Sequence, residues 1–145
     1  MAPLHVANGH CTTRLIEAAG LSGRTQIWAD VLHDGPVPDV PDDELVRVRA
    51  RVIASGLDVT PEAVEADLRH WRAVVDDHAA YDELVLWFEH DLFDQLNLIQ
   101  LLSRVGAGSR HHSENAMQAQ PMAPIGPAVV VATSSSNAMV RSALR

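Results

Sequence analysis

The sequence has no lysine, a single cysteine and few aromatic residues, and each shortage argues against a class of function. All 11 basic residues are arginine, against 19 acidic residues, and the formal net charge is −8. Nonspecific binding to nucleic acid and binding to acidic membrane surfaces both depend on dense positive charge, so we expect neither here. Cys11 has no partner for an internal disulfide, which is typical of a reducing cytoplasm.

Long apolar runs are also missing from the chain. No stretch approaches the roughly 18 apolar residues that cross a bilayer. The first residues lack the basic segment and long apolar segment of a signal peptide. With 145 residues, of which 47% are apolar and 21% charged, the chain has the composition of one globular domain. We therefore expect a cytoplasmic protein without a membrane segment.

The composition changes near residue 105. Residues 1–105 carry 18 acidic residues, 8 arginines and every aromatic residue, whereas residues 106–145 carry one acidic residue and three arginines. Because cores normally use aromatic residues, we expect 1–105 to form the domain and 106–145 to be a poorly structured tail. Within the tail, 128–133 is apolar enough for a short strand. The tail is either natural and flexible, or the result of a truncation or a change of reading frame.

Apolar segments typical of strands alternate with helical patterns in the first 105 residues. Strands are predicted at 4–7, 25–29 and 83–88, with a helix after each and two helices between the second and the third. This alternation predicts an α/β domain, specifically a small three-layer, Rossmann-like domain with a parallel sheet core. Three strands make a small sheet, so we expect the domain to be incomplete at its C-terminus or to take strands from the tail.

The spacing of apolar residues predicts which face of each helix is buried. The inward residues are expected to be Leu45, Val48, Val52 and Ile53 in the helix at 41–55, Val64, Leu68, Trp71 and Val75 in the helix that begins at Pro61, and Leu92, Leu96, Ile99 and Leu102 in the helix at 92–104. Two histidines of the helix after Pro61 and its end, His70 and His78, are expected at the surface.

Polar residues follow each of the three predicted strands. These groups are Asn8-Gly9-His10-Cys11 after the first strand, Asp30 and His33-Asp34 after the second, and Glu89-His90-Asp91 after the third. In a parallel sheet the carboxyl ends of all strands lie along one edge, where ligands bind. The sequence therefore predicts a site at this edge.

The residue types suggest roles for a hydrolytic site. Glu89 or His33 would act as the general base, His90 as an acid or a ligand, and Asp30 as a substrate contact that orients a histidine. Asp34 would hold a divalent metal together with Asp91, although the spacing matches no established metal signature.

Structural roles compete with these assignments for both aspartates. Asp91 equally suits the cap of the helix that begins at Leu92, and Asp34 suits the turn before Gly35.

The first strand-to-helix junction has the makings of an anion site. Asn8, Gly9 and Thr12 stand where backbone N–H groups and hydroxyls at a helix N-terminus bind phosphate, and we predict them to contact substrate. The segment is neither a G-x-G-x-x-G fingerprint nor a P-loop. Cys11 is either a nucleophile beside His10 or, more commonly for a lone cysteine, a small buried residue.

Three segments together resemble a bacterial family catalogued as domain of unknown function 1835: residues 4–9 (LHVANG), 28–38 (WADVLHDGPVP) and 84–96 (LVLWFEHDLFDQL). The resemblance covers residues 4–104 and implies a small α/β domain of uncharacterised function, usually within a longer chain. It supplies no reaction, cofactor or catalytic residue. This chain departs from the family pattern at His10 and Cys11, where an aspartate and a small hydroxyl residue are more usual, and past Val105.

Two hypotheses of function follow. In the first, the sheet edge binds a phosphorylated small molecule or nucleotide, with a divalent metal in one version, and an enzymatic version of this site hydrolyses the ligand. In the second, the domain is a non-catalytic sensing or interaction module that uses the same crevice for recognition or binds a partner protein through acidic helices. A truncated, inactive copy is the third interpretation. The acidic helices carry Asp42, Asp43, Glu44, Glu62, Glu65, Asp67, Asp76 and Asp77.

Overall fold

The computed structural model describes residues 2–116, 128–135 and 138–143, with side chains for residues 2–107. Ten elements are described in this part of the chain. They are β1 (Leu4–Ala7), α1 (His10–Ala18), β2 (Arg24–Ile27), α2 (Asp42–Ser55), α3 (Pro61–Asp76), the 3₁₀ helix η1 (His78–Ala80), β3 (Glu83–Trp87), α4 (Leu92–Ala116), β4 (Ala128–Ser135) and β5 (Ala138–Ala143).

The strands form one sheet in the order β2-β1-β3-β4-β5. The first four run parallel, and β5 pairs antiparallel with β4. From β1 the chain moves outward to β2 and then returns across β1 to start β3 on the other side. The direction of winding thus reverses between β1 and β3, which is the place where doubly wound sheets bind their ligands.

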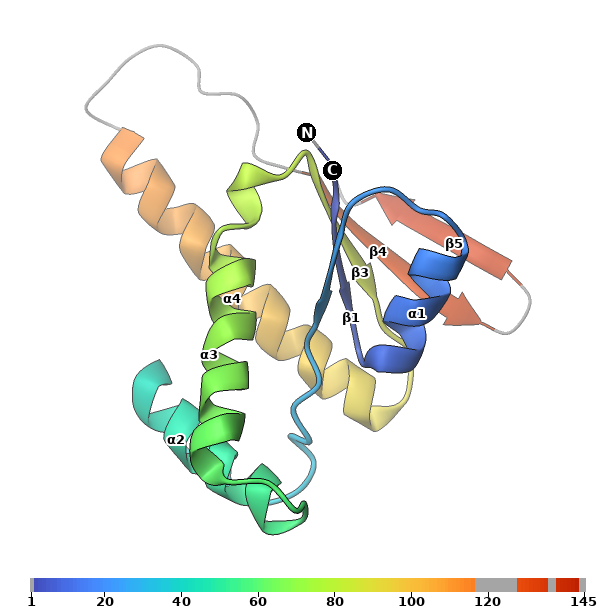
Figure 1. The fold of residues 1–145 in the computed structure, drawn as a ribbon. Coiled ribbons are helices and arrows are strands. Elements are labelled where there is room, and N and C mark those ends of the chain that lie inside the picture. Colours follow the sequence, from blue (N-terminus) through green and yellow to red (C-terminus); the bar gives the residue numbers. More distant parts are fainter. Residues whose placement is uncertain (1, 117–127, 136–137, 144–145) are drawn as a thin grey trace.

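Helices cover both faces of the sheet, which makes the domain three layers thick (Figure 1). Helix α1 lies on one face, against β1 and β2, while α3 and α4 lie on the other and α2 packs on α3. The α/β class with a parallel core is therefore confirmed. No helix among the described residues is long and apolar enough to cross a membrane.

The central strands are buried because helices cover them on both sides. All of β1 is buried, and so are the three middle residues of β3. Their side chains meet the C-terminal end of α3 and the middle of α4 in one core that includes Leu4, Val6, Val75, Leu84, Leu86 and Leu101. A run of apolar residues without alternation is what a parallel strand of this kind requires.

Helix α3 follows its sequence pattern closely. The Thr60 hydroxyl accepts a hydrogen bond from Ala63 N–H at 3.2 Å, and Pro61 occupies the first turn, where its missing N–H costs nothing. Val64, Leu68 and Val75 are buried as predicted. Trp71 is partly buried against the core of the sheet and against a second cluster, which Val64 and Leu68 form with apolar residues of α2. Beyond the helix His78 is buried, not exposed, and its Nδ1 lies 2.8 Å from the Val75 carbonyl.

The predicted inward face of α4 is wrong, and that of α2 is only partly correct. The four apolar residues expected to be inward in α2 are only partly buried, and those of α4 include Leu92 and Ile99, which are 66% and 60% exposed. The buried residues are Val46, Arg49, Ala50 and Ala54 in α2 and Asp94, Asn97, Leu101 and Val105 in α4. The spacing of apolar residues does not identify these faces, because each buried face also contains polar side chains that bind the loops after the strands.

The segment after residue 105 also differs from the prediction. Helix α4 continues through residue 105 to Ala116, so the predicted boundary falls inside a helix. The apolar segment at 128–133 forms a strand as predicted, within β4. It pairs in parallel with β3 and extends the sheet past the three strands of residues 1–105.

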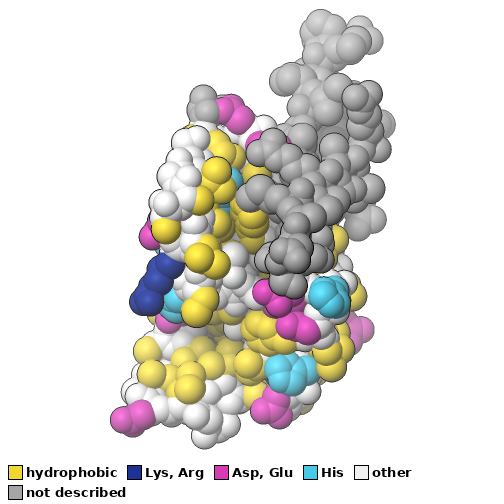
Figure 2. All heavy atoms as spheres, turned by 90° about the vertical axis from the view of Figure 1, so that its right-hand side faces the viewer, with side chains coloured by type: hydrophobic (Ala, Val, Ile, Leu, Met, Phe, Trp, Pro, Cys, Tyr) yellow, Lys and Arg dark blue, Asp and Glu magenta, His cyan; other side chains and the backbone are white. Residues whose placement is uncertain are grey.

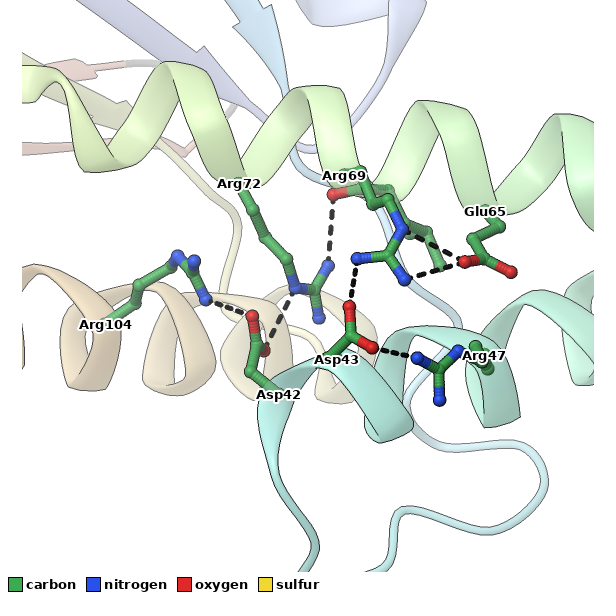
Figure 3. Close-up of polar contacts among 8 residues, drawn as sticks. Asp42, Asp43, Arg47, Glu65, Arg69, Arg72 and Arg104 are labelled. Carbon is green, nitrogen blue, oxygen red and sulfur yellow. Dashed lines mark hydrogen bonds and ion pairs between the residues drawn. The ribbon is translucent and has the colours of Figure 1, made fainter.

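Ion pairs tie the three helices of one layer together (Figure 3). Asp42 at the start of α2 accepts hydrogen bonds from Arg72 of α3 at 3.1 Å and from Arg104 of α4 at 2.8 Å. Arg104 also holds Asp76 of α3 through two bonds of 2.7 Å. A second group joins Asp43, Arg47, Glu65 and Arg69.

The Asp42 ion pairs predict a loss of stability in acid. Partial burial acts to raise the pKa of Asp42, but hydrogen bonds from Arg104 and the charge of Arg72 outweigh it and hold the pKa below its ordinary value of 3.8. Because the folded pKa is the lower one, the stabilisation is complete above about pH 4 and is lost as the pH falls through the folded value.

We expect Asp42→Asn to lower the free energy of unfolding by at most about 1 kcal/mol at neutral pH, since the side chain is half exposed. Urea titrations over a range of pH should show that this difference closes in acid. Asp58→Asn, at an exposed turn position, is the control and should show no such closing. A constant Asp42→Asn deficit at every pH would contradict the prediction.

Candidate functional site

The three parallel strands end level with one another, as the predicted site requires. Ala7 at the end of β1 is in register with Ile27 of β2 and Trp87 of β3. The three loops that follow therefore leave the sheet at the same edge. The start of α4 lies beside this edge and forms hydrogen bonds with all three loops.

The buried carboxylate of Asp94, in the first turn of α4, joins the loop after β3 to the end of β1. Asn8 Nδ2 donates to both Asp94 oxygens, at 3.0 and 2.9 Å, and the Glu89 backbone N–H donates to Oδ2. Thr12 of α1 in turn donates to Asn8 Oδ1 at 2.7 Å. This chain of bonds spans the switch point and fixes the side chain of Asn8 on both of its polar ends.

Asp91 is the cap of α4, which confirms the structural alternative for this residue. Its Oδ1 accepts a hydrogen bond from Asp94 N–H at 2.9 Å, and its side chain is otherwise exposed. Gln95 Nε2 donates to the Glu89 carbonyl at 2.7 Å, so the loop between strand and helix is held at several points. The side chains of Glu89 and His90 extend from this loop and are exposed.

Asp30 has a structural partner that the sequence analysis did not foresee. Its carboxylate is 3% exposed and accepts hydrogen bonds from Arg49 at 2.8 to 3.1 Å. Its backbone N–H and carbonyl bond to the side chain of Asn97 at 2.9 and 2.7 Å. The predicted role of Asp30 as a substrate contact that orients a histidine is therefore corrected: its carboxylate faces Arg49.

Arg49 also shapes the loop that follows Asp30. Its guanidinium donates to three carbonyls of this loop, those of Val31, Asp34 and Pro36, at 2.8 to 3.0 Å. Gly35 makes the turn with a φ of +72°, and a Cβ there would lie 2.7 Å from a methyl group of Val52. This position needs glycine both for its backbone conformation and for space.

The loop presents His33 and Asp34 to solvent. The His33 ring packs edge-on against Phe93 with 5.8 Å between ring centroids, which places it near the start of α4. Asp34, predicted as a metal ligand, donates its backbone N–H to the Val31 carbonyl in the turn. Among the described residues no group of three or more His, Cys, Asp or Glu side chains is arranged to hold a metal, so Asp34 and Asp91 form no such centre there.

A cavity of about 270 Å³ opens at the switch point between α1 and the end of β3. Asn8, Thr12 and Glu89, three of the predicted site residues, line its polar part. The rest of its lining is apolar and comes from Leu15, Ile16, Ala19, Leu21, Trp87 and Phe88. Figure 2 shows this side of the molecule, where histidine and acidic side chains lie next to hydrophobic ones.

The wall and the surroundings of the cavity are fixed by local contacts. Trp87 is fixed in the wall because its indole N–H donates to His5 Nδ1 at 3.1 Å, while His5 Nε2 lies 3.0 Å from the Ser22 carbonyl. Gly9 is the N-cap of α1 and supplies no side chain to the first-turn N–H groups. Those N–H groups are therefore free of a side-chain cap at the position predicted for a phosphate.

Three residues that position the site, Arg49, Asp94 and Asn97, are not among those that the sequence predicts. Each lies on the buried face of its helix: Arg49 follows Val46 by three residues, Asn97 precedes Leu101 by four, and Asp94 precedes Asn97 by three. A polar residue on such a face needs a buried partner. The usable signal was a match between these residues and the polar strand ends, Asn8 and Asp30, whose side chains or backbone groups they bind.

The Asp30–Arg49 pair should be the most sensitive ion pair of the fold. Arg49→Met leaves a buried carboxylate and three carbonyls without their donor, and we expect it to cost about 3–5 kcal/mol of unfolding free energy. Arg47→Met, two residues earlier in the same helix, removes an ion pair whose side chains are about half exposed. It should cost less than about 1 kcal/mol. Urea denaturation measures both, and equal losses would contradict the assigned importance of Arg49.

Asp94 gives a second comparison within one turn of helix. In Asp94→Asn an amide N–H₂ replaces an oxygen that accepts from Asn8 or Glu89, so we expect a loss of about 1–3 kcal/mol and faster hydrogen exchange at the Glu89 amide. Asp91→Asn keeps a side chain that caps helices well and should cost a few tenths of a kcal/mol at most. Unchanged exchange in Asp94→Asn would show that Asp94 does not hold this loop.

No family model, curated protein or solved structure matches this chain. What the site binds must therefore follow from its geometry and its chemistry. The geometry offers a small cavity at the switch point, with an apolar wall, a polar mouth and the first turn of α1 beside it.

Proposed function

We propose that this domain binds a nucleotide, or a similar phosphorylated small molecule, in the cavity between α1 and the end of β3. The observation that supports this proposal is the position of the cavity at the switch point, where Asn8, Thr12 and Glu89 line it together. The assignment to domain of unknown function 1835 belongs to the same proposal, because residues 84–96, which carry that resemblance, include Trp87, Phe88 and Glu89 of the wall.

The parts of a nucleotide match different parts of the cavity. The apolar wall of Ile16, Trp87 and Phe88 suits a flat base, and small-ligand sites are generally apolar with a few polar groups. The Glu89 carboxylate suits sugar hydroxyls, which donate to it, and it repels a phosphate. The phosphate would therefore lie at the first turn of α1, where N–H groups and the helix dipole favour an anion.

A hydrolytic step would use Glu89. It is the carboxylate that lines the cavity and is exposed to water, so it is suited to take a proton from an attacking water molecule. His90, the next residue, is exposed and would supply a proton to the leaving group. A divalent cation would enter with the phosphates of the ligand, since Mg²⁺ commonly binds through substrate phosphates and few protein ligands.

The alternative of a partner protein bound through the acidic helices gains no support from the ion pairs. Asp42, Asp43, Glu65 and Asp76 already pair with arginines of the same chain. Their charge is therefore balanced within the helical layer. The switch-point cavity is the better supported site.

The three tryptophans provide a test of this proposal in the intact chain. Adenosine, AMP and ATP with Mg²⁺ would be titrated while the indole N–H signals are followed by NMR. We expect the Trp87 signal to move, because Trp87 lines the cavity, and the signal of Trp71, which does not line it, to stay. A ligand at a hundred times its dissociation constant adds about 2.7 kcal/mol of stability, which raises the melting temperature by several degrees.

Two variants separate binding from hydrolysis. Glu89→Gln should weaken nucleoside binding and abolish any phosphate release, whereas Glu83→Gln, at the opposite end of the same strand, should change neither. Phosphate release from ATP that disappears in Glu89→Gln would establish the enzyme. Binding without release would establish a sensing module, and a Trp87 signal that no nucleoside or nucleotide moves would overturn the proposed function.

A further inference from the structure

A second and larger cavity, of about 460 Å³, lies among α2, α3 and α4 on the other face of the sheet. Its size is within the usual range for small-ligand sites. The cavity has an apolar part and a charged part. Its lining includes Trp28, Leu45 and Ala107, the acids Asp42 and Asp76, and the arginines Arg72 and Arg104.

Trp28 forms part of this cavity and carries an unsatisfied polar group. The residue is 2% exposed, and its Nε1–H has no hydrogen-bond acceptor among the residues that the structure describes. Every other buried side-chain nitrogen or oxygen in that part of the chain has a partner. A buried donor without an acceptor is unusual enough to require an explanation, and a bound ligand supplies one.

Arg72 lies beside this donor. Its guanidinium stacks over the Trp28 ring, 5.5 Å from the ring centroid, and the side chain is 6% exposed. It donates to Asp42 and to the Leu68 carbonyl, which fixes its plane. A carboxylate placed here would accept from Arg72 and from the Trp28 N–H, a charge-assisted arrangement that arginine favours.

The rim of the cavity offers hydrogen-bond acceptors, whereas Trp28 and Arg72 offer donors. Asp42 and Asp76 are both held by Arg104, yet their side chains are 48% and 52% exposed (Figure 3 shows Asp42). A carboxylate has about four acceptor positions, so each retains room for another donor. The two positive and two negative charges of the lining pair with one another, so a ligand with a net charge would upset a balance that a zwitterion keeps.

We propose that this cavity binds a free α-amino acid, whose carboxylate faces Arg72 and Trp28 and whose ammonium group faces Asp42 and Asp76. The zwitterion matches both sets of charges while its side chain occupies the space beside Leu45 and Ala107. This site is separate from the switch-point cavity, and it does not depend on the proposed function.

The indole signals test this proposal in the same intact chain. Pools of free L-amino acids and then single ones would be titrated, with acetate and methylamine as probes of the two charges taken separately. We expect a saturable movement of the Trp28 signal with amino acids, a response at least about tenfold weaker with either single-charge probe, and no movement of Trp71 or Trp87. A movement of Trp87 instead would report the switch-point cavity.

Substitutions at exposed alanines keep the test independent of folding. Ala107→Trp fills the cavity from its rim and should weaken binding at least about tenfold, whereas Ala66→Trp, exposed on α3 outside the lining, should leave binding unchanged. Equal responses to acetate and to amino acids, binding unaffected by Ala107→Trp, or a Trp28 signal that no amino acid moves would each overturn the proposal.

Discussion

The buried carboxylate of Asp94 is the interaction on which the site depends. A parallel sheet brings strand ends to one edge, but it does not fix the loops that leave them. Asp94 does so by accepting hydrogen bonds from the Asn8 side chain and the Glu89 backbone, across the point where the winding of the sheet reverses. The mouth of the switch-point cavity is therefore set by a side chain that does not line it.

The same helix holds the loop after β2 in a different way. One turn after Asp94, the Asn97 side chain accepts from the Asp30 N–H and donates to the Asp30 carbonyl, while the Asp30 carboxylate pairs with Arg49. The loops after β3 and β2 are thus anchored to consecutive turns of α4, and each anchor is a polar side chain on a buried helix face. This arrangement explains why the exposed residues of α4 include leucine and isoleucine while its buried residues include aspartate and asparagine.

These features mark what could be read from the sequence and what could not. The strands, their parallel direction and the gathering of polar residues at one edge follow from local patterns, because strand periodicity and alternation with helices depend on neighbours in the chain. The inward faces of α2 and α4 do not, because the burial of Arg49 and Asp94 depends on partners 19 and 86 residues away. Of the predicted site residues, Asn8, Thr12 and Glu89 share a cavity, while Asp30 and Asp91 have structural partners.

The use of arginine in place of lysine has a structural reason in these networks. Arg49 serves one carboxylate and three carbonyls at once, and Arg104 holds two aspartates from different helices. A lysine ammonium has three donors and no plane, so it could not satisfy either set in the same geometry. Many acidic residues in the helical layer are therefore structural partners of arginine, which separates them from Glu89. Its carboxylate remains exposed at the cavity, whereas those of Asp42, Asp43 and Asp76 are paired with arginines.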